Sequence, residues 1–197
     1  MTVPPPERVS GIVLAGGKAR RMGGTDKGLI PCGGRPLISY AIEALRPLCG
    51  HLFINANRSL QEYERFGLPL IQDSIAGFQG PLAGILSGLE TATTPYLLVS
   101  PCDCPRLETA TLARLLGSLE AQRMDIALAS DGERLHPVVM ALRTHLASDL
   151  AGWLASGKRR IDAWARRHRW IGLDLSDAAN QFVNINTPRD LAEYEGR

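Results

Sequence analysis

The sequence predicts a three-layer α/β fold in which a mainly parallel sheet carries helices on both faces. Short apolar runs alternate with amphipathic segments of helical length along most of the 197 residues. Strands that alternate with crossover helices form mainly parallel sheets covered on both sides. With 45% hydrophobic and 21% charged residues, and with neither an internal repeat nor a linker, the chain is expected to form a single domain over residues 1–197.

The N-terminal half supplies the first strands of this sheet. Prolines at 4–6 predict a flexible arm over residues 1–7, and the apolar run VSGIVLA at 9–15 predicts the first strand. A helix is expected from Pro36, because proline is tolerated in a first helical turn and apolar residues then recur at helical spacing. The elements that follow are a strand at 51–57, a helix at 59–66, a strand at 68–73, a helix at 81–90 and a strand at 96–100.

The C-terminal half continues the alternation. Its expected elements are a helix over about 108–121, a strand at 126–130, a turn at 131–136, a strand at 137–142, helical segments from about 143 to 168, and a helix that begins at TPRD. Thr187 before Pro188 supplies a helix cap for the last of these.

Composition excludes several classes of protein. No apolar run approaches the ~20 residues that span a bilayer, and the first residues lack the layout of a signal peptide, so we expect a cytoplasmic protein without membrane contact. Cys32, Cys49, Cys102 and Cys104 contain no CxxC pair, which predicts reduced thiols and no structural metal. A net charge of +2, with no recognition motif, argues against binding to nucleic acid.

A glycine-rich, basic loop follows the first strand. The stretch GIVLAGGKARRMGGTDKG ends at Gly28, and its cations Lys18, Arg20, Arg21 and Lys27 against the single Asp26 give a local net charge of +3. Glycine lets backbone amides approach a ligand closely, and basic side chains attract anions, so the loop predicts a phosphate site. Neither the Walker pattern nor the dinucleotide fingerprint fits the spacing of these glycines.

Polar residues stand at the ends of the other predicted strands. Because ligands of open α/β sheets lie outside the carboxyl ends of the strands, Asn55, Asp73 and Asp103 are expected at one edge with the glycine loop. A carboxylate held between two prolines suits Mg²⁺, which takes one or two protein carboxylates and completes its shell with water and phosphate oxygens. The alternatives are a capping or turn aspartate at 103 and at 73, and an ordinary exposed lysine at 27.

Further motifs appear in a fixed order along the chain. They are NANR at 55–58, QDS at 72–74, GPLAGI at 80–85, PCDCP at 101–105, DGERLHP at 131–137, GKRR at 157–160 and FVNINTPRD at 182–190. Together with LAGGKARRMGGTDKGL at 14–29, these motifs resemble the molybdenum cofactor guanylyltransferase family, also called the molybdopterin-guanine dinucleotide biosynthesis protein A family. The loop alone is typical of nucleotidyltransferases in general, whereas the combined set spans nearly the whole chain. The resemblance implies a Rossmann-like nucleotidyltransferase fold.

The resemblance also implies a reaction. In this family the terminal phosphate of molybdenum-loaded molybdopterin attacks the α-phosphorus of GTP, with Mg²⁺ as cofactor, and the products are molybdopterin guanine dinucleotide and pyrophosphate. Such a transfer depends on alignment and on charge neutralisation, and the incoming phosphate is already anionic, so no general base is required. A labile pterin benefits from direct handover, so transient contacts with proteins of the cofactor pathway and with acceptor molybdoenzymes are expected.

Individual residues inherit roles from the motifs they match. The implied GTP-binding residues are Leu14, Ala15, Gly16, Lys27, Asn55, Asp73 and Asp103. Asp103 also binds Mg²⁺, Lys27 binds phosphate, and Arg21 affects turnover, which makes these three the implied catalytic set. The implied residues of the pterin side are Arg160, Asn184 and Asn186. The chain departs from the family pattern at Cys104, which follows Asp103 where a threonine or another small residue is expected.

Three features allow more than one interpretation. His136 is expected to have a structural or substrate-lining role, because the sequence fixes no partner for it. In the basic stretch at 158–169, Arg160 is expected to be functional and the other cations to lie on the surface. Asn184 and Asn186 lie on the same side of an extended segment, since side chains alternate with period two, and both are expected to face one ligand.

Alternative functions remain within and outside this enzyme class. A cytidylyltransferase of the same pterin pathway or a sugar nucleotidyltransferase would share the spacing of the motifs, since spacing does not reveal the base. A cofactor-binding chaperone would use the same cleft without catalysis.

Overall fold

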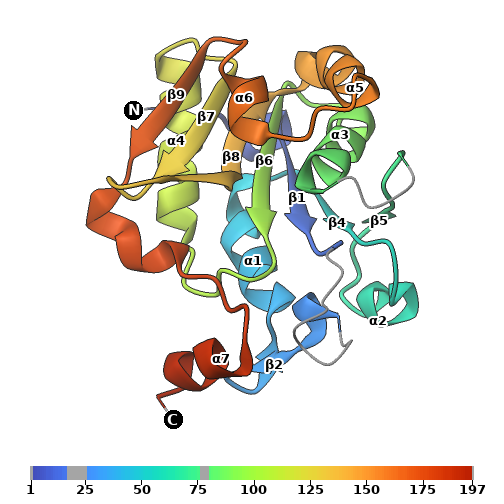
Figure 1. Cartoon of the computed structure of the whole chain (residues 1–197), viewed down its shortest axis with the longest axis vertical. Coiled ribbons are helices and arrows are strands. Elements are labelled where there is room, and N and C mark those ends of the chain that lie inside the picture. Colours follow the sequence, from blue (N-terminus) through green and yellow to red (C-terminus); the bar gives the residue numbers. More distant parts are fainter. Residues whose placement is uncertain (1, 17–25, 76–79, 197) are drawn as a thin grey trace.

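A seven-stranded sheet forms the centre of the protein (Figure 1). The computed structural model describes residues 2–16, 26–75 and 80–196. The strands of the sheet are β1 (Val9–Leu14), β4 (His51–Asn55), β5 (Leu70–Ile71), β6 (Tyr96–Pro101), β7 (Ile126–Ser130), β8 (Leu135–Arg143) and β9 (Trp170–Asp174). They lie in the order β5-β4-β1-β6-β8-β7-β9, and within this sheet β8 alone runs antiparallel to its neighbours. The predicted mainly parallel sheet is therefore confirmed.

Helices cover both faces of the sheet. On one face lie α1 (Ile38–Leu45) and α4 (Thr109–Ala121), and on the other lie α3 (Pro81–Thr91), α5 (Ala147–Ala155) and α6 (Ile161–Ala165). Neighbouring strand residues alternate between the two cores: Leu97 packs with the α3 side and Leu98 with the α1 side. Each such buried leucine stabilises the fold by roughly 1.5–3 kcal/mol relative to exposure. Because both faces of β6 are buried, nearly all of its residues are apolar.

Shorter elements complete the chain. They are η1 (Pro6–Arg8), η2 (Lys27–Leu29), β2 (Pro31–Cys32), β3 (Arg35–Pro36), η3 (Arg46–Leu48), α2 (Leu60–Glu64), η4 (Thr144–Leu146), η5 (Ser176–Phe182) and α7 (Pro188–Tyr194). The predicted cap of α7 is confirmed, because the Thr187 side chain accepts a hydrogen bond from the Asp190 amide. None of the helices in the described ranges combines the length and the apolar character needed to cross a membrane.

The segment before β1 packs against the domain. Pro4 is buried, and the Gly50 amide donates a hydrogen bond of 2.6 Å to the Pro6 carbonyl. A flexible arm over residues 1–7 would lack these contacts. The three prolines instead hold an extended approach that ends in η1 and leads directly into the first strand.

The helix expected from Pro36 begins two residues later, at Ile38. Pro36 belongs to a small antiparallel hairpin made by β2 and β3, in which it pairs with Pro31. The two glycines between these strands have φ angles of 58° and 81°. This left-handed pair builds a tight hairpin turn, which keeps Pro36 in extended backbone.

The last third of the chain differs from the prediction at two places. The expected turn at 131–136 is shorter, because β8 already begins at Leu135. The strand β9 was not predicted: it follows the helical segments and pairs with β7 alone, at one edge of the sheet. Its residues are mostly half-buried or exposed, so it lacks the continuous apolar pattern of the central strands.

Candidate active site

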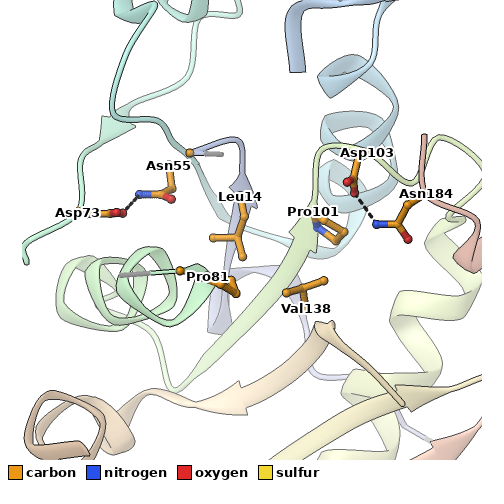
Figure 2. A pocket seen from close by; sticks show the side chains of 10 residues that line it. Leu14, Asn55, Asp73, Pro81, Pro101, Asp103, Val138 and Asn184 are labelled. Carbon is orange, nitrogen blue, oxygen red and sulfur yellow. Dashed lines mark hydrogen bonds between the residues drawn. The ribbon is translucent and has the colours of Figure 1, made fainter. Parts of the chain in front are cut away.

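A cavity of about 430 Å³ opens at the carboxyl ends of β1, β4 and β6 (Figure 2). Each of these parallel strands stops at this edge, so the residues at and after its end face one space. The cavity is lined by Leu14, Gly16, Asn55, Asp73, Gly80, Pro81, Pro101, Asp103, Val138 and Asn184. Six of these residues were predicted as site residues, and they come from five separate parts of the chain.

Figure 2 shows two polar ends of this cavity separated by apolar side chains. Asn55 and Asp73 lie at one end, and Asp103 and Asn184 lie at the other. The floor between them consists of Leu14, Pro81, Pro101 and Val138. The arrangement suits an elongated ligand that is polar at both ends.

The first polar end is a network of amides around one carboxylate. Asn55 donates to Asp73 Oδ1 at 2.9 Å, and Asn57 donates to Asp73 Oδ2 at 2.9 Å. The Asp73 amide in turn donates to Asn57 Oδ1 at 2.9 Å. Both oxygens of the carboxylate are therefore held in place by fixed donors. Sequence reasoning missed Asn57, although the two-residue spacing of NAN places it on the same side of the chain as Asn55.

Two glycines make room for these asparagines. A Cβ atom at Gly84 would lie 2.2 Å from Asn55 Oδ1, and a Cβ atom at Gly16 would lie 3.0 Å from Asn57 Nδ2. Any side chain at position 84 would displace the Asn55 amide. Glycine at these positions thus lets the backbone of the loop and of α3 approach the amide network closely.

The second polar end joins segments from opposite ends of the chain. Lys27 forms an ion pair with Asp103 and donates to Asn186 Oδ1 at 2.6 Å, while Asn184 donates to Asp103 Oδ1 at 3.0 Å. The side chains of Lys27 and Asp103 are only 18% and 14% exposed. Asn184 and Asn186 therefore face the same charged pair, as their spacing predicted.

Two buried thiols flank this aspartate. Burial, together with the charge of Asp103, raises the pKa of both Cys102 and Cys104. Both thiols are therefore protonated at neutral pH in the ligand-free protein, so neither is a thiolate nucleophile there. Cys104 lies 3.5 Å from Asn184 Oδ1 and leaves Asp103 directed into the cavity. All four cysteines are free, as predicted.

The carboxylate at 103 fits a metal ion that is shared with a substrate. Within the described ranges, no cluster of three or more His, Cys, Asp or Glu side chains is arranged to hold a metal ion. A single carboxylate beside an asparagine oxygen is, however, the hard-oxygen environment that Mg²⁺ takes when phosphates and waters supply its remaining ligands. Asp103 therefore fits Mg²⁺ brought in with a nucleotide better than a resident metal centre.

One predicted residue lies on the surface away from the cavity, and another falls outside the described residues. Arg160 is absent from the lining of the cavity; its side chain is 79% exposed and pairs with Asp162 at 2.6 Å. The paired Asp162 carboxylate keeps this guanidinium near α6 in the ligand-free protein. Arg21 lies outside the described residues, as do Lys18 and Arg20 of the same loop.

His136 has the partner that the sequence did not reveal. Its Nε2 atom lies 2.7 Å from Asp131 Oδ2, and its ring stacks on Phe182 with centroids 4.6 Å apart. The Arg134 amide and the His136 ring lower the pKa of Asp131 by hydrogen bonding. The ring thus ties the β7–β8 turn to the segment that leads to Asn184, which is a structural role.

The cavity at the sheet edge and the lysine–carboxylate pair suit a nucleotidyltransferase, an enzyme that needs aligned phosphates and neutralised charge rather than a covalent nucleophile. Residues 11–170 match the family described as the MobA-like NTP transferase domain, and the chain belongs to this family.

Curated relatives and solved structures agree with this assignment. The Molybdenum cofactor guanylyltransferase of Shewanella halifaxensis is 45% identical over 181 residues, which cover 92% of this chain and 90% of that protein. The protein of the same name from Shewanella frigidimarina is 46% identical over 181 residues, with 92% of both chains covered.

Solved structures share the fold at lower identity. Molybdopterin-guanine dinucleotide biosynthesis protein A from Archaeoglobus fulgidus superposes with a TM-score of 0.81 at 23% identity, covering 95% of this chain and 97% of that one. The 2-C-methyl-D-erythritol 4-phosphate cytidylyltransferase of Thermus thermophilus gives a TM-score of 0.69 at 18% identity, covering 94% and 96%. The same architecture therefore serves different bases and acceptors, so fold alone does not select the substrate.

Proposed function

We propose that this chain transfers GMP from GTP to the terminal phosphate of molybdenum-loaded molybdopterin and so forms molybdopterin guanine dinucleotide and pyrophosphate. An oxygen of the acceptor phosphate forms a bond to the α-phosphorus, and the bond from that phosphorus to the oxygen bridging to the β-phosphate breaks. The bonding electrons leave with pyrophosphate. The relatives that share more than 40% of the sequence and bear the name molybdenum cofactor guanylyltransferase support this choice of substrates.

The nucleoside end of GTP is assigned to the amide network. Asn55 and Asp73 are fixed by mutual hydrogen bonds, so they offer a rigid set of acceptors and donors. The backbone of Leu14, Ala15 and Gly16 turns beside them, since Leu14 pairs with Asn55 and the Ala15 amide donates to the Asn55 carbonyl at 2.9 Å. Such rigidity contributes to alignment because these side chains have little conformational freedom left to lose on binding.

The phosphates are assigned to the space between the N-terminus of α3 and the Lys27–Asp103 pair. The helix α3 begins there at Pro81, directly after Gly80, and unpaired backbone amides at a helix N-terminus attract anions. The ammonium group of Lys27 lies at the second polar end, paired with Asp103 in the ligand-free protein. On nucleotide binding Lys27 turns from the carboxylate to a phosphate oxygen, which leaves Asp103 available to a cation.

Mg²⁺ is the cation assigned to Asp103, and when bound it supplies neutralisation of the triphosphate charge. The exchange of partners leaves neither member of the Lys27–Asp103 pair without a counter-charge, because Lys27 gains a phosphate oxygen and Asp103 gains the cation. Asn184 holds the carboxylate during this change through its hydrogen bond to Oδ1.

The pterin substrate is assigned to the side of the cavity lined by Asn184. Asn186 accepts a hydrogen bond from Lys27 of the same charged pair. Arg160 is assigned to the acceptor phosphate from the family motif, and its long side chain would have to leave Asp162 to bind there. Arg21 is assigned to turnover from the family motif. Four free cysteines agree with a reducing compartment, so we place the reaction, and the handover of the product to acceptor molybdoenzymes, in the cytoplasm.

One observation carries the proposal: Gly16, Asp73 and Asp103, which follow the ends of three separate strands, line one cavity. The test is release of pyrophosphate when the purified protein is incubated with Mg²⁺, molybdenum-loaded molybdopterin and either GTP or CTP. Release with GTP and its absence with CTP is the expected result. Release with CTP alone identifies a cytidylyltransferase, and cofactor delivery without pyrophosphate release identifies a binding protein.

A further inference from the structure

The short turn that carries Lys27 is fastened to the protein by its two neighbours. Asp26 is 3% exposed and Gly28 is buried, whereas the Lys27 side chain points the opposite way and reaches Asp103. The turn is closed by hydrogen bonds from the Leu29 amide to the Asp26 carbonyl at 2.9 Å and from the Ile30 amide to the Lys27 carbonyl at 3.3 Å. The direction of Lys27 thus depends on what holds residues 26 and 28.

Asp26 is held by a cation from the loop after β4. Its Oδ2 atom lies 3.4 Å from Arg58 Nε, and the two side chains are 1% and 34% exposed. Burial raises the pKa of Asp26, while the charge of Arg58 and the hydroxyl of Tyr63 act against that rise. A carboxylate this deep in the protein is costly unless it has a counter-charge, so Asp26 and Arg58 constrain each other.

Gly28 allows the turn to approach Tyr63 of α2 closely. A Cβ atom at this position would lie 2.7 Å from Tyr63 Oη and 3.4 Å from Ile38 Cβ. Tyr63 is fully buried in α2, so it offers a rigid surface. The turn therefore packs against Tyr63 of α2 through Gly28 and pairs with Arg58 through Asp26.

We propose that the Asp26–Arg58 ion pair positions Lys27 for the nucleotide phosphates. The close packing of Gly28 on Tyr63 holds the turn in place. The inference rests on the proposed function, in which Lys27 binds phosphate. Arg58 follows Asn57 directly in NANR, so one loop carries both the nucleoside contacts and the anchor of the lysine. Asp26 and Arg58 are positioning residues in this account: they act on the substrate through Lys27.

A double-mutant cycle separates positioning from general stabilisation. The Kd for GTP with Mg²⁺ is measured by calorimetry for wild type, Asp26→Asn, Lys27→Ala and the double variant. Asp26→Asn is expected to weaken binding about tenfold in the wild-type background, a typical coupling between residues in contact, and by less than about twofold when Lys27 is already absent. Equal weakening in both backgrounds overturns the proposal, and so does a Lys27→Ala variant with unchanged affinity.

The chain offers a matched control at the opposite edge of the sheet. Asp125 precedes β7 and accepts hydrogen bonds from Arg169 at 2.7 and 2.9 Å, so it is another mostly buried, arginine-paired carboxylate. Asp125→Asn is expected to lower Tm without changing the Kd for GTP in either background. A change in Kd as large as that of Asp26→Asn indicates a non-specific effect and overturns the proposal.

A second variant covers the case in which Asp26→Asn does not fold. Gly28→Ala moves the turn by steric contact with Tyr63 and leaves the ion pair chemically intact. Its weakening of GTP binding is expected to vanish in the Lys27→Ala background by the same logic. Pyrophosphate release by the wild type tests the proposed function independently. If the wild type does not use GTP, the double-mutant cycle is measured with the nucleoside triphosphate that the wild type binds. That measurement still tests whether Asp26 positions Lys27.

Discussion

Replacing Asp103 by asparagine removes one charge from the cavity and keeps the shape of the side chain. Asp103 is 14% exposed and stands between Lys27 and Asn184. Two unit charges 4 Å apart interact by about 4 kcal/mol at an effective dielectric of 20, so a carboxylate beside a divalent cation gains about 8 kcal/mol at that separation. Desolvation offsets most of this gain. If one third of it survives, about 2.7 kcal/mol, the loss is about a hundredfold in rate.

The same substitution has a smaller effect on folding. The Lys27–Asp103 pair is neither exposed nor fully buried, so its loss is expected to cost about 1–2 kcal/mol, between the values for surface and buried pairs. For a chain of this length that cost lowers Tm by about 2–8 °C. The fold is expected to remain intact, since native proteins are stable by about 5–15 kcal/mol.

The assay is pyrophosphate release with Mg²⁺, GTP and molybdenum-loaded molybdopterin, with circular dichroism as the measure of folding. Asp177→Asn is the matched control, because that carboxylate is 67% exposed and pairs with Arg114. It is expected to retain wild-type activity. An Asp103→Asn variant that keeps more than about a third of wild-type kcat/KM would refute the assignment of Asp103 to the cation, since the electrostatic reasoning requires a far larger loss.

Three further substitutions have distinct expected outcomes. Lys27→Ala is expected to raise the Kd for GTP at least about tenfold in calorimetry, with a fall in Tm similar to that of Asp103→Asn because the same ion pair is lost, and an unchanged Kd removes Lys27 from the phosphate site. Gly84→Ala places a Cβ atom 2.2 Å from Asn55 Oδ1, so we expect a raised KM for GTP and a loss of about 1–3 kcal/mol in denaturant unfolding; full activity contradicts the role of Asn55. Hydrogen bonds from Arg169 hold the pKa of Asp125 below its ordinary value of 3.8, so this pair stabilises the fold above that pH and the contribution is lost as pH falls through the folded pKa. The Tm difference between wild type and Asp125→Asn should therefore be largest near neutral pH and shrink below about pH 4; a difference that grows in acid contradicts this sign.

The sequence predicted those site residues whose position follows from topology. The ends of β1, β4 and β6 meet at one edge in any mainly parallel sheet, so the meeting of Gly16, Asn55 and Asp103 required only the strand assignments. The common direction of Asn184 and Asn186 followed from the two-residue period of extended chain.

Other features depended on packing that periodicity does not contain. The partner of His136 is Asp131, which reaches it only because the chain between them closes a turn held by backbone hydrogen bonds to the same carboxylate. The edge strand β9 has an exposed glycine at its centre and only half-buried neighbours, so its pairing with β7 decides its conformation more than its own composition does. The burial of Asp26 likewise depends on Arg58, far along the chain.

A crystal structure with GTP and Mg²⁺ tests the central claim most directly. The account predicts that an Asp103 oxygen lies about 2.1 Å from the metal ion, that Lys27 has left Asp103 for a phosphate oxygen, and that the base lies beside Asn55 and Asp73. A triphosphate bound outside this cavity, with the Lys27–Asp103 ion pair still intact, would contradict it.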